Sequence, residues 1–426
     1  MKKKLENRKN NKSIIVSTLI FVITFIAMAG YLIYFNLTQA ESIINNSYNK
    51  RQGVLSRRTI RGSILSDDKT KLAVTNVDDD GNETRYYPYS GLFSHAIGYL
   101  NNGGYGLESL YGYYMLHSNQ NFFEQIGNDL SGNRNTGDNV VTTLNVGLQK
   151  ACYDALGSNR GAVIVMEPST GKILAMVSKP DFDPNTLAAN WSQITGEGSD
   201  SVLVNRATQG LYPPGSTFKL ITMLEYLREH KNDYGQYHYI CDGTYELGNN
   251  TINCVRTTAH GDVDLFSSLA VSCNCSFINI GLSLDLDRYK KTAEKMLFNK
   301  ELPTNLEYNK SRFVLNGESS EWDIAQTSFG QGKTVITPFH LALITCTIAN
   351  NGTLMEPYLV SSVESTNGMT VKKFKEEKYD TLITEKEASL LKKGMEQVVK
   401  DSFSWLFGGV EYTLAAKSGS AQYGTE

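Results

Sequence analysis

The 426-residue sequence is poor in several features, and each scarcity excludes a class of protein. It holds only six cysteines, so disulfide bonds cannot be the main source of its stability. It has no low-complexity tract, and its composition is that of a globular protein with room for one large domain and a smaller companion. A formal net charge of −3 gives no excess of positive charge, and we expect no nucleic-acid partner.

Charge is also absent from residues 13–36, a stretch long enough to cross a bilayer as a helix. The six basic residues and one acidic residue before it give residues 1–12 a charge of +5 and leave −8 for the rest. This asymmetry predicts a cytoplasmic stub at 1–12, a single-pass anchor in the cell membrane at 13–36, and an extracytoplasmic body. The alternative is a signal peptide cleaved near Ala29, which we disfavour because the apolar run continues through Phe35.

The spacing of the cysteines indicates little chemistry. Cys241 and Cys254 flank a turn-rich stretch and are candidates for a disulfide, although isolated buried thiols fit about equally well. Cys273 and Cys275 are separated by one residue, which is not the paired spacing of a zinc site. We therefore expect no metal.

Residues 37–143 suggest a small, irregular module. A short polar helix is expected from Thr38 to about Lys50, and the alternating residues 57–65 favour a strand. The remainder is rich in Gly, Asn and Tyr and has no paired carboxylates or clustered metal ligands at a spacing typical of a site. We interpret this module as a scaffold or docking surface.

Residues 144–426 predict an α+β domain. Strands are expected at 161–166 and 172–178, joined by a Pro-Ser-Thr-Gly turn, and again at 410–416. Helical spacing of apolar residues predicts helices at 145–156, 217–231, 264–270, 275–284, 339–349 and 385–400. Strands at both ends of the domain, with helices between them, indicate one antiparallel sheet that contains the terminal strands and is flanked by helices.

The chain is organised around Ser216, which opens the helix at 217–231 after a rigid turn. Pro213 and Pro214 restrict the backbone on entry, and Gly215 leaves room beside the serine. Ser216 and Lys219 share a helix face, so the amine can reach the hydroxyl, and the helix N-terminus favours negative charge there. This pattern alone is weak, since a serine in this position is commonly an N-cap.

Two further short motifs follow in the chain, Ser272-Cys273-Asn274 in a break between two helices and Lys417-Ser418-Gly419 at the end of a predicted strand. Together with Ser216-x-x-Lys219 they match, in order, the S-x-x-K, S-D-N and K-T-G motifs of penicillin-binding proteins and β-lactamases. Each motif singly favours a structural role. Their conjunction predicts a catalytic site.

Over nearly its whole length the sequence resembles the class B penicillin-binding proteins, membrane-anchored D,D-transpeptidases of peptidoglycan synthesis, and its small module most resembles that of compact, elongation-type members. Residues 37–143 are short for the glycosyltransferase domain of class A relatives. The resemblance implies a pedestal module at 37–143 and a transpeptidase domain at 144–426. Besides the three motifs it rests on 61–64 (RGSI), 106–108 (GLE), 161–163 (GAV), 205–207 (NRA), 330–332 (GQG), 337–338 (TP) and 349–352 (ANNG).

Two departures from the family stand out. Ser418 replaces the usual threonine, which keeps the hydroxyl. The family also continues past the third motif through further strands and a helix, whereas this sequence ends at Glu426, so we expect the transpeptidase domain to be C-terminally incomplete.

The resemblance implies a role for each motif residue. Ser216 would attack the carbonyl between two D-alanines of a peptidoglycan stem peptide, with Lys219 as base and Ser272 as proton relay. Asn274 would hold Lys219 and the substrate amide. No cofactor is expected, and a β-lactam would acylate Ser216.

The third motif and the residue after it are expected to bind substrate. Lys417 would supply positive charge near the substrate carboxylate, with the hydroxyls of Ser418 and Ser420 as donors and Gly419 between them. The backbone N–H groups of Ser216 and Ser420 would form the oxyanion hole.

Other functions remain open at this level. A D,D-carboxypeptidase would use the same site with water as acceptor, and a β-lactamase or β-lactam sensor is disfavoured by the large juxtamembrane module. A non-catalytic scaffold that activates a polytopic membrane glycosyltransferase is a different alternative, and such a glycosyltransferase is an expected partner in either case. His260 suggests a Ser-His triad, which we disfavour because Ser216 already has a lysine at helical spacing. The acceptor amine and the choice between elongation and division are not indicated.

Overall fold

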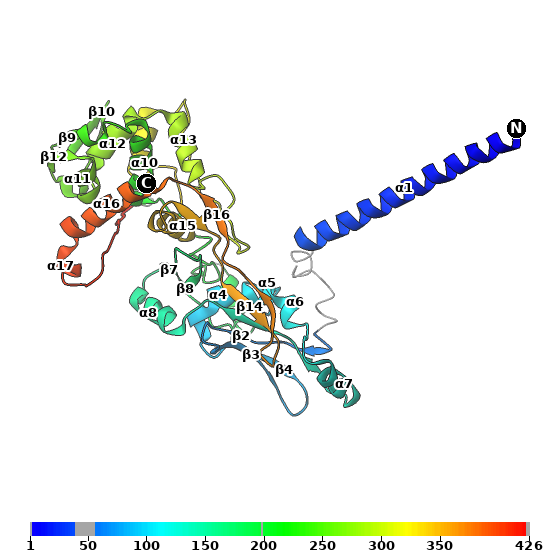
Figure 1. Cartoon of the computed structure of the whole chain (residues 1–426). Coiled ribbons are helices and arrows are strands. Elements are labelled where there is room, and N and C mark those ends of the chain that lie inside the picture. The colour runs from blue at the N-terminus through cyan, green and yellow to red at the C-terminus, as the bar shows by residue number, and fades with distance from the viewer. Residues whose placement is uncertain (1, 39–55, 197–198, 423–426) are drawn as a thin grey trace.

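A computed structural model describes residues 2–38, 56–196 and 199–422 of the chain (Figure 1). The short helix expected from Thr38 to about Lys50 lies outside the described residues except for Thr38 itself, which ends the first helix. Helix α1 (Lys2–Thr38) stands apart from the body. Its segment Ile14–Phe35 is 22 residues long, and none of it is buried, so it is long and apolar enough to span a membrane once.

A mixed six-stranded sheet forms the base of the body, in the order β15-β14-β6-β2-β3-β4. Strand β6 lies at its centre, parallel to β2 and antiparallel to β14. Strands β14 and β15, which come late in the chain, thus extend a sheet whose other strands belong to the small module. Its strands are β2 (Ile64–Leu65), β3 (Lys71–Val77), β4 (Glu83–Tyr86), β6 (Asn139–Thr142), β14 (Val360–Glu364) and β15 (Thr370–Lys373).

The strand predicted at 57–65 forms as two short strands, β1 (Thr59–Ile60) and β2, because residues 61–63 between them are not part of a strand. Gly62 donates its N–H to the carbonyl of Met115, and a Cβ at this position would overlap the carbonyl of Asp138. Strand β1 pairs instead with β5 (Asn135–Thr136).

An ion triplet fixes the core of the small module. Glu108 accepts from Arg61 Nε at 2.9 Å and from Arg85 Nε at 2.7 Å, and all three side chains are buried. Burial alone would raise the pKa of Glu108, but the charges of Arg85 and Arg61 hold it below its ordinary value. The RGSI and GLE stretches therefore meet in space. Short helical segments complete the module: η1 (Ser90–Phe93), α4 (Ser94–Ile97), α5 (Leu107–Leu110), α6 (Gly112–Met115) and α7 (Phe122–Leu130).

The larger half of the body is built around helix α10 (Lys219–Glu229). Residues 219–227 are all buried, because the helix passes between α12, α13 and α16. Each predicted helix around it begins and ends within two residues of its predicted bounds. The helices of this half are α8 (Val146–Leu156), α11 (Leu265–Ala270), α12 (Asn274–Ser283), α13 (Leu286–Lys295), α14 (Glu321–Ser328), α15 (Pro338–Ala349) and α16 (Glu385–Ser402), with short helices α9 (Trp191–Thr195) and α17 (Ser404–Phe407).

The predicted hairpin forms as β7 (Gly161–Met166) and β8 (Ile173–Lys179), with α8 and α15 packed against it. Two further pairs of strands, β9 with β12 and β10 with β11, make a small lobe beside α12. The strands not yet given are β9 (His238–Cys241), β10 (Thr244–Leu247), β11 (Asn250–Asn253), β12 (Gly261–Asp264), β13 (Thr353–Met355) and β16 (Lys378–Thr381).

The strand predicted at 410–416 does not form: described residues 408–422 contain no strand, and the β7–β8 hairpin remains a two-stranded sheet. A strand needs a neighbouring strand for its backbone hydrogen bonds. The segment instead runs beside α16, where Ala416 donates its N–H to the carbonyl of Met395 (Figure 1). The α+β class is observed, but the sheet of terminal strands is a wrong prediction within the described residues.

Candidate active site

Ser216 sits in a single 3₁₀ turn, η2 (Gly215–Phe218), immediately before α10. Gly215 has a left-handed φ of 56°, and a Cβ there would lie 2.5 Å from the carbonyl oxygen of Ser420. Its N–H donates to the carbonyl of Gly330 at 2.8 Å, and a Cβ at Gly330 would overlap the carbonyl oxygen of Gly215. Two glycines therefore allow three backbone segments to meet at the serine.

Lys219 is fully buried at the first turn of α10. Its Nζ donates to the carbonyl oxygen of Ser272 at 2.7 Å, to Oδ1 of Asn274 at 2.8 Å and to Oγ of Ser272 at 3.3 Å. Burial, together with the nearby charge of Lys417, lowers the pKa of Lys219 to about 7. A substantial fraction of this amine is therefore neutral near neutral pH, as a proton acceptor must be.

Ser272 lies in the break between α11 and α12, as predicted, whereas Asn274 is the first residue of α12. Ser272 has a left-handed φ of 56°, which turns its carbonyl and hydroxyl toward the two lysines. Asn274 begins α12, and its Nδ2 donates to the carbonyl of Asn253 at 3.0 Å. Sequence reasoning did not indicate Asn253, because nothing in its spacing relates it to the motif.

Lys417 connects the third motif to the Ser272 hydroxyl. Its Nζ donates to Ser272 Oγ at 2.9 Å and to the carbonyl of Ser418 at 2.9 Å. Burial lowers the pKa of Lys417 to about 8. Ser272 therefore accepts from two amines whose positive charges disfavour one another, an arrangement that can pass a proton through one hydroxyl.

The remaining predicted residues line the open side of the site. Ser418, Gly419 and Ser420 are exposed, and a Cβ at Gly419 would lie 3.0 Å from the carbonyl of Pro214. Ser216 is half-buried, and its hydroxyl makes no hydrogen bond within residues 2–38, 56–196 and 199–422. The structure thus brings together all the predicted site residues, but it does not show the expected hydrogen bond from Lys219 to Ser216.

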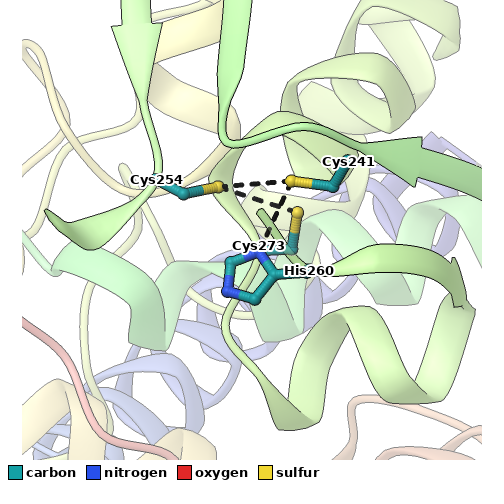
Figure 2. A group of neighbouring side chains, drawn as sticks. All are labelled: Cys241, Cys254, His260 and Cys273. Atoms are coloured by element: carbon teal, nitrogen blue, oxygen red, sulfur yellow. Dashed lines mark hydrogen bonds between the residues drawn. The ribbon is translucent and has the colours of Figure 1, made fainter. Parts of the chain in front are cut away.

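The cysteines form a group that their spacing did not indicate (Figure 2). Cys241, Cys254 and Cys273 lie with His260 around one point, and Cys275 lies beside Cys254. All four cysteines are free thiols. The candidate Cys241–Cys254 disulfide therefore does not form in this structure, where the two sulfurs are 3.8 Å apart. His260 contacts Cys241 at 3.4 Å, which gives no support to a Ser-His triad.

A half-buried serine at a helix mouth, a buried lysine of low pKa and a hydroxyl shared by two lysines define a serine enzyme of the acyl-transfer class. Comparison with known proteins gives the family. Residues 161–426 match the penicillin-binding protein transpeptidase domain, and residues 61–140 match the penicillin-binding protein A dimerisation domain. The chain belongs to the penicillin-binding protein transpeptidase family.

Individual relatives agree. The peptidoglycan D,D-transpeptidase PbpA of Mycolicibacterium smegmatis is 30% identical over 370 residues, which cover 81% of this chain and 72% of the relative. For PbpA of Mycobacterium tuberculosis the identity is 32% over 327 residues, or 72% of this chain and 65% of the relative.

Solved structures are similarly close. The imipenem acyl-enzyme complex of penicillin-binding protein A from M. tuberculosis has a TM-score of 0.77 at 28% identity and covers 86% of this chain and 87% of its own. The D,D-transpeptidase domain of a peptidoglycan glycosyltransferase from Eggerthella lenta also has a TM-score of 0.77, at 29% identity, with 86% and 88% coverage. The predicted class, a serine-type D,D-transpeptidase of the penicillin-binding protein family, is confirmed over the alternatives.

Proposed function

We propose that this chain cross-links peptidoglycan stem peptides through an acyl-enzyme on Ser216. Neutral Lys219 accepts the serine proton as Oγ attacks the carbonyl carbon between two D-alanines. Because Lys219 and Lys417 both donate to Ser272 Oγ, that hydroxyl relays a proton to the leaving nitrogen, and the terminal D-alanine departs. An amine of a second stem peptide then attacks the ester, its proton returns through Lys219, and Ser216 is released.

Substrate binding is assigned to the third motif, in which Lys417 is half-buried and Ser418 and Gly419 are exposed. Lys417 provides a positive charge for the substrate carboxylate, and Ser418 and Ser420 offer hydroxyl donors on the open side of the site. The backbone of Ser420 lies beside Gly215, and this proximity supports an oxyanion hole formed by the N–H groups of Ser216 and Ser420. Losing one such donor typically costs about 3 kcal/mol of transition-state stabilisation.

The observation that carries this proposal is the buried Lys219, which is hydrogen-bonded to both residues of the second motif. The test is covalent labelling of the full-length chain with a fluorescent penicillin, read by intact mass and peptide mapping. Labelling should be confined to Ser216 and vanish in Ser216→Ala, while Ser404→Ala on α17 labels normally. Labelling on another residue would refute the assignment of the nucleophile. Product analysis with a peptide amine as acceptor separates cross-linking from carboxypeptidase activity.

The membrane arrangement is part of the proposal. We infer that residues 1–12 are cytoplasmic and that the body is extracytoplasmic, because the +5 charge precedes Ile14–Phe35. Protease treatment of spheroplasts should degrade the body and leave a small fragment that contains α1. Protection of the body would reverse the orientation.

A polytopic membrane glycosyltransferase is the proposed partner, contacted through α1 and the module at 37–143. Exposed apolar side chains on α7 support this, since Phe123 is 79% and Leu130 is 84% exposed. Co-purification of the glycosyltransferase should survive Ser216→Ala and weaken in Leu130→Asp. Equal recovery with both variants would exclude α7 from the contact.

The division between the pedestal at 37–143 and the transpeptidase domain at 144–426 remains a proposal. Strands β14 and β15 join the pedestal sheet from the second part of the chain. We expect limited proteolysis to leave the two parts associated, because separating them would break that sheet.

A further inference from the structure

Four elements converge beside the Ser272 turn and bring sulfur and imidazole donors to one point. Figure 2 shows the four side chains pointing toward one another. The three cysteines are buried and the histidine is half-buried, and their donor atoms all lie within 4.8 Å of one another. The residues are Cys241 at the end of β9, Cys254 after β11, His260 before β12 and Cys273 at the N-cap of α12.

Three distances between the donor atoms match those around a tetrahedral metal ion. Sγ of Cys254 lies 3.8 Å from Sγ of Cys241 and 3.8 Å from Sγ of Cys273. Sγ of Cys241 lies 3.4 Å from Nδ1 of His260. Tetrahedral zinc, with bonds of about 2.3 Å to sulfur and about 2.0 Å to nitrogen, separates two sulfurs by about 3.8 Å and sulfur from nitrogen by about 3.5 Å.

We propose that this group binds one structural zinc ion, with Cys241, Cys254, His260 and Cys273 as its four ligands. Three thiolates and an imidazole suit zinc, and a site with four protein ligands has no open position for substrate. Each cysteine releases its proton to solvent when the ion binds. The ion neither touches substrate nor takes part in acyl transfer.

Cys275 belongs to the next layer of the site. Its Sγ lies 3.4 Å from Sγ of Cys254, and it is not among the four mutually close donors. A thiol in that position donates to the Cys254 thiolate and orients it.

The small lobe that supplies three of the ligands buries few apolar side chains, chiefly Ile252 and Val263. It consists of two pairs of short strands, and apolar side chains such as Ile240 and Val255 are 80% and 68% exposed. Two-stranded sheets are marginal by themselves. The four buried cysteines form a cluster separate from the main core. A metal bound in this cluster would supply folding energy to the lobe.

The ion would also position the second catalytic motif. Cys273 lies between Ser272 and Asn274, so a ligand bond at Cys273 restrains the left-handed turn at Ser272. Asn274 is tied to the carbonyl of Asn253, the neighbour of Cys254. The motif is therefore restrained at Cys273, a proposed ligand, and through Asn253, the neighbour of another proposed ligand. This coupling rests on the proposed function, whereas the metal site does not.

The first test is the metal content of the full-length chain, purified in detergent without chelators. We expect about one zinc per chain in the wild type and at least a tenfold lower content in Cys254→Ser. Cys346→Ser, which changes a buried thiol on α15, is the matched control and should keep its zinc. Metal-free wild type, a Cys241–Cys254 disulfide in the native protein, or zinc retained by Cys254→Ser would each overturn the proposal.

A second variant keeps the test decisive if Cys254→Ser fails to fold. His260→Ala changes a half-buried side chain, and its far-ultraviolet circular dichroism should match the wild type. Its zinc should be lost to a chromogenic chelator at least about tenfold more readily. Cobalt substitution of the wild type should produce a strong thiolate-to-cobalt absorption band. Unchanged zinc retention in His260→Ala, or the absence of this absorption band, would refute the proposed set of ligands.

Acyl transfer gives a separate readout. Removing zinc should slow penicillin labelling of Ser216 at least tenfold, and adding zinc back should restore it. Unchanged labelling after removal would refute the positioning role. A chain that binds zinc but never labels would refute the proposed function and leave the metal site intact.

Discussion

Lys219 donates from Nζ to the backbone carbonyl of Ser272 at 2.7 Å, so the proposed general base is held by the main chain of a second motif more than 50 residues away. Because the acceptor is a backbone carbonyl, this bond does not depend on the protonation of the Ser272 side chain. It keeps the amine in place both before and after it accepts a proton. Two of the three sequence motifs thus form one unit.

The acylation rate should depend on the protonation of Lys219. Its pKa is lowered to about 7, so the rate constant for penicillin labelling should rise as pH increases from about 5.5 to about 8. The group is buried and faces Lys417 and the thiols of Cys254, Cys273 and Cys275. Lys417→Met removes the positive charge that lowers this pKa, so the midpoint should move to higher pH. A midpoint that falls or stays unchanged in Lys417→Met would contradict the coupling of the two lysines.

The same lysine should cost stability at neutral pH. Its pKa is about 7 when folded and ordinarily 10.5, so the unfolded chain binds more protons between these values and stability rises with pH. Relative to Lys219→Met, the wild type should gain about 2 kcal/mol of unfolding free energy between pH 7 and pH 9. Denaturant titrations of both proteins at the two pH values measure this, and a parallel response of the two would reject the lowered pKa.

Sequence patterns predicted that the motif residues would meet, because the first two motifs lie at local breaks that their own residues create. The Pro-Pro-Gly turn before Ser216 and the gap before α12 are examples. The helices were predicted for a similar reason, since the apolar spacing of α10, α15 and α16 follows from local periodicity.

The rest depends on contacts between distant segments. Residues 410–416 have the alternation of a strand, but no described strand pairs with them. The sequence did not predict the cysteine group, because Cys241, Cys254, His260 and Cys273 belong to or flank four different elements and meet only in the folded chain. Strands β14 and β15 join a sheet whose other members precede residue 143.

Gly330 should be required for the nucleophile turn. Its φ is 84°, and a Cβ there would overlap the carbonyl of Gly215, so Gly330→Ala must displace the turn that carries Ser216. We expect at least a tenfold loss of labelling rate and a lower melting temperature. Gly317→Ala is the matched control, since no atom lies within 4 Å of its Cβ position. Comparable losses in the two variants would show that glycine removal in general, and not this contact, is responsible.

Glu108 should be essential to the stability of the small module but not to the chemistry at Ser216. Glu108→Gln would leave the charges of Arg61 and Arg85 buried without a counter-ion, at a cost of about 3–5 kcal/mol. Asp154→Asn, which breaks an exposed pair with Lys150, should cost less than about 1 kcal/mol. Thermal unfolding followed by circular dichroism compares them. Below the melting temperature Glu108→Gln should label Ser216 at the wild-type rate, and slow labelling by a folded variant would mean that the module acts on the active site.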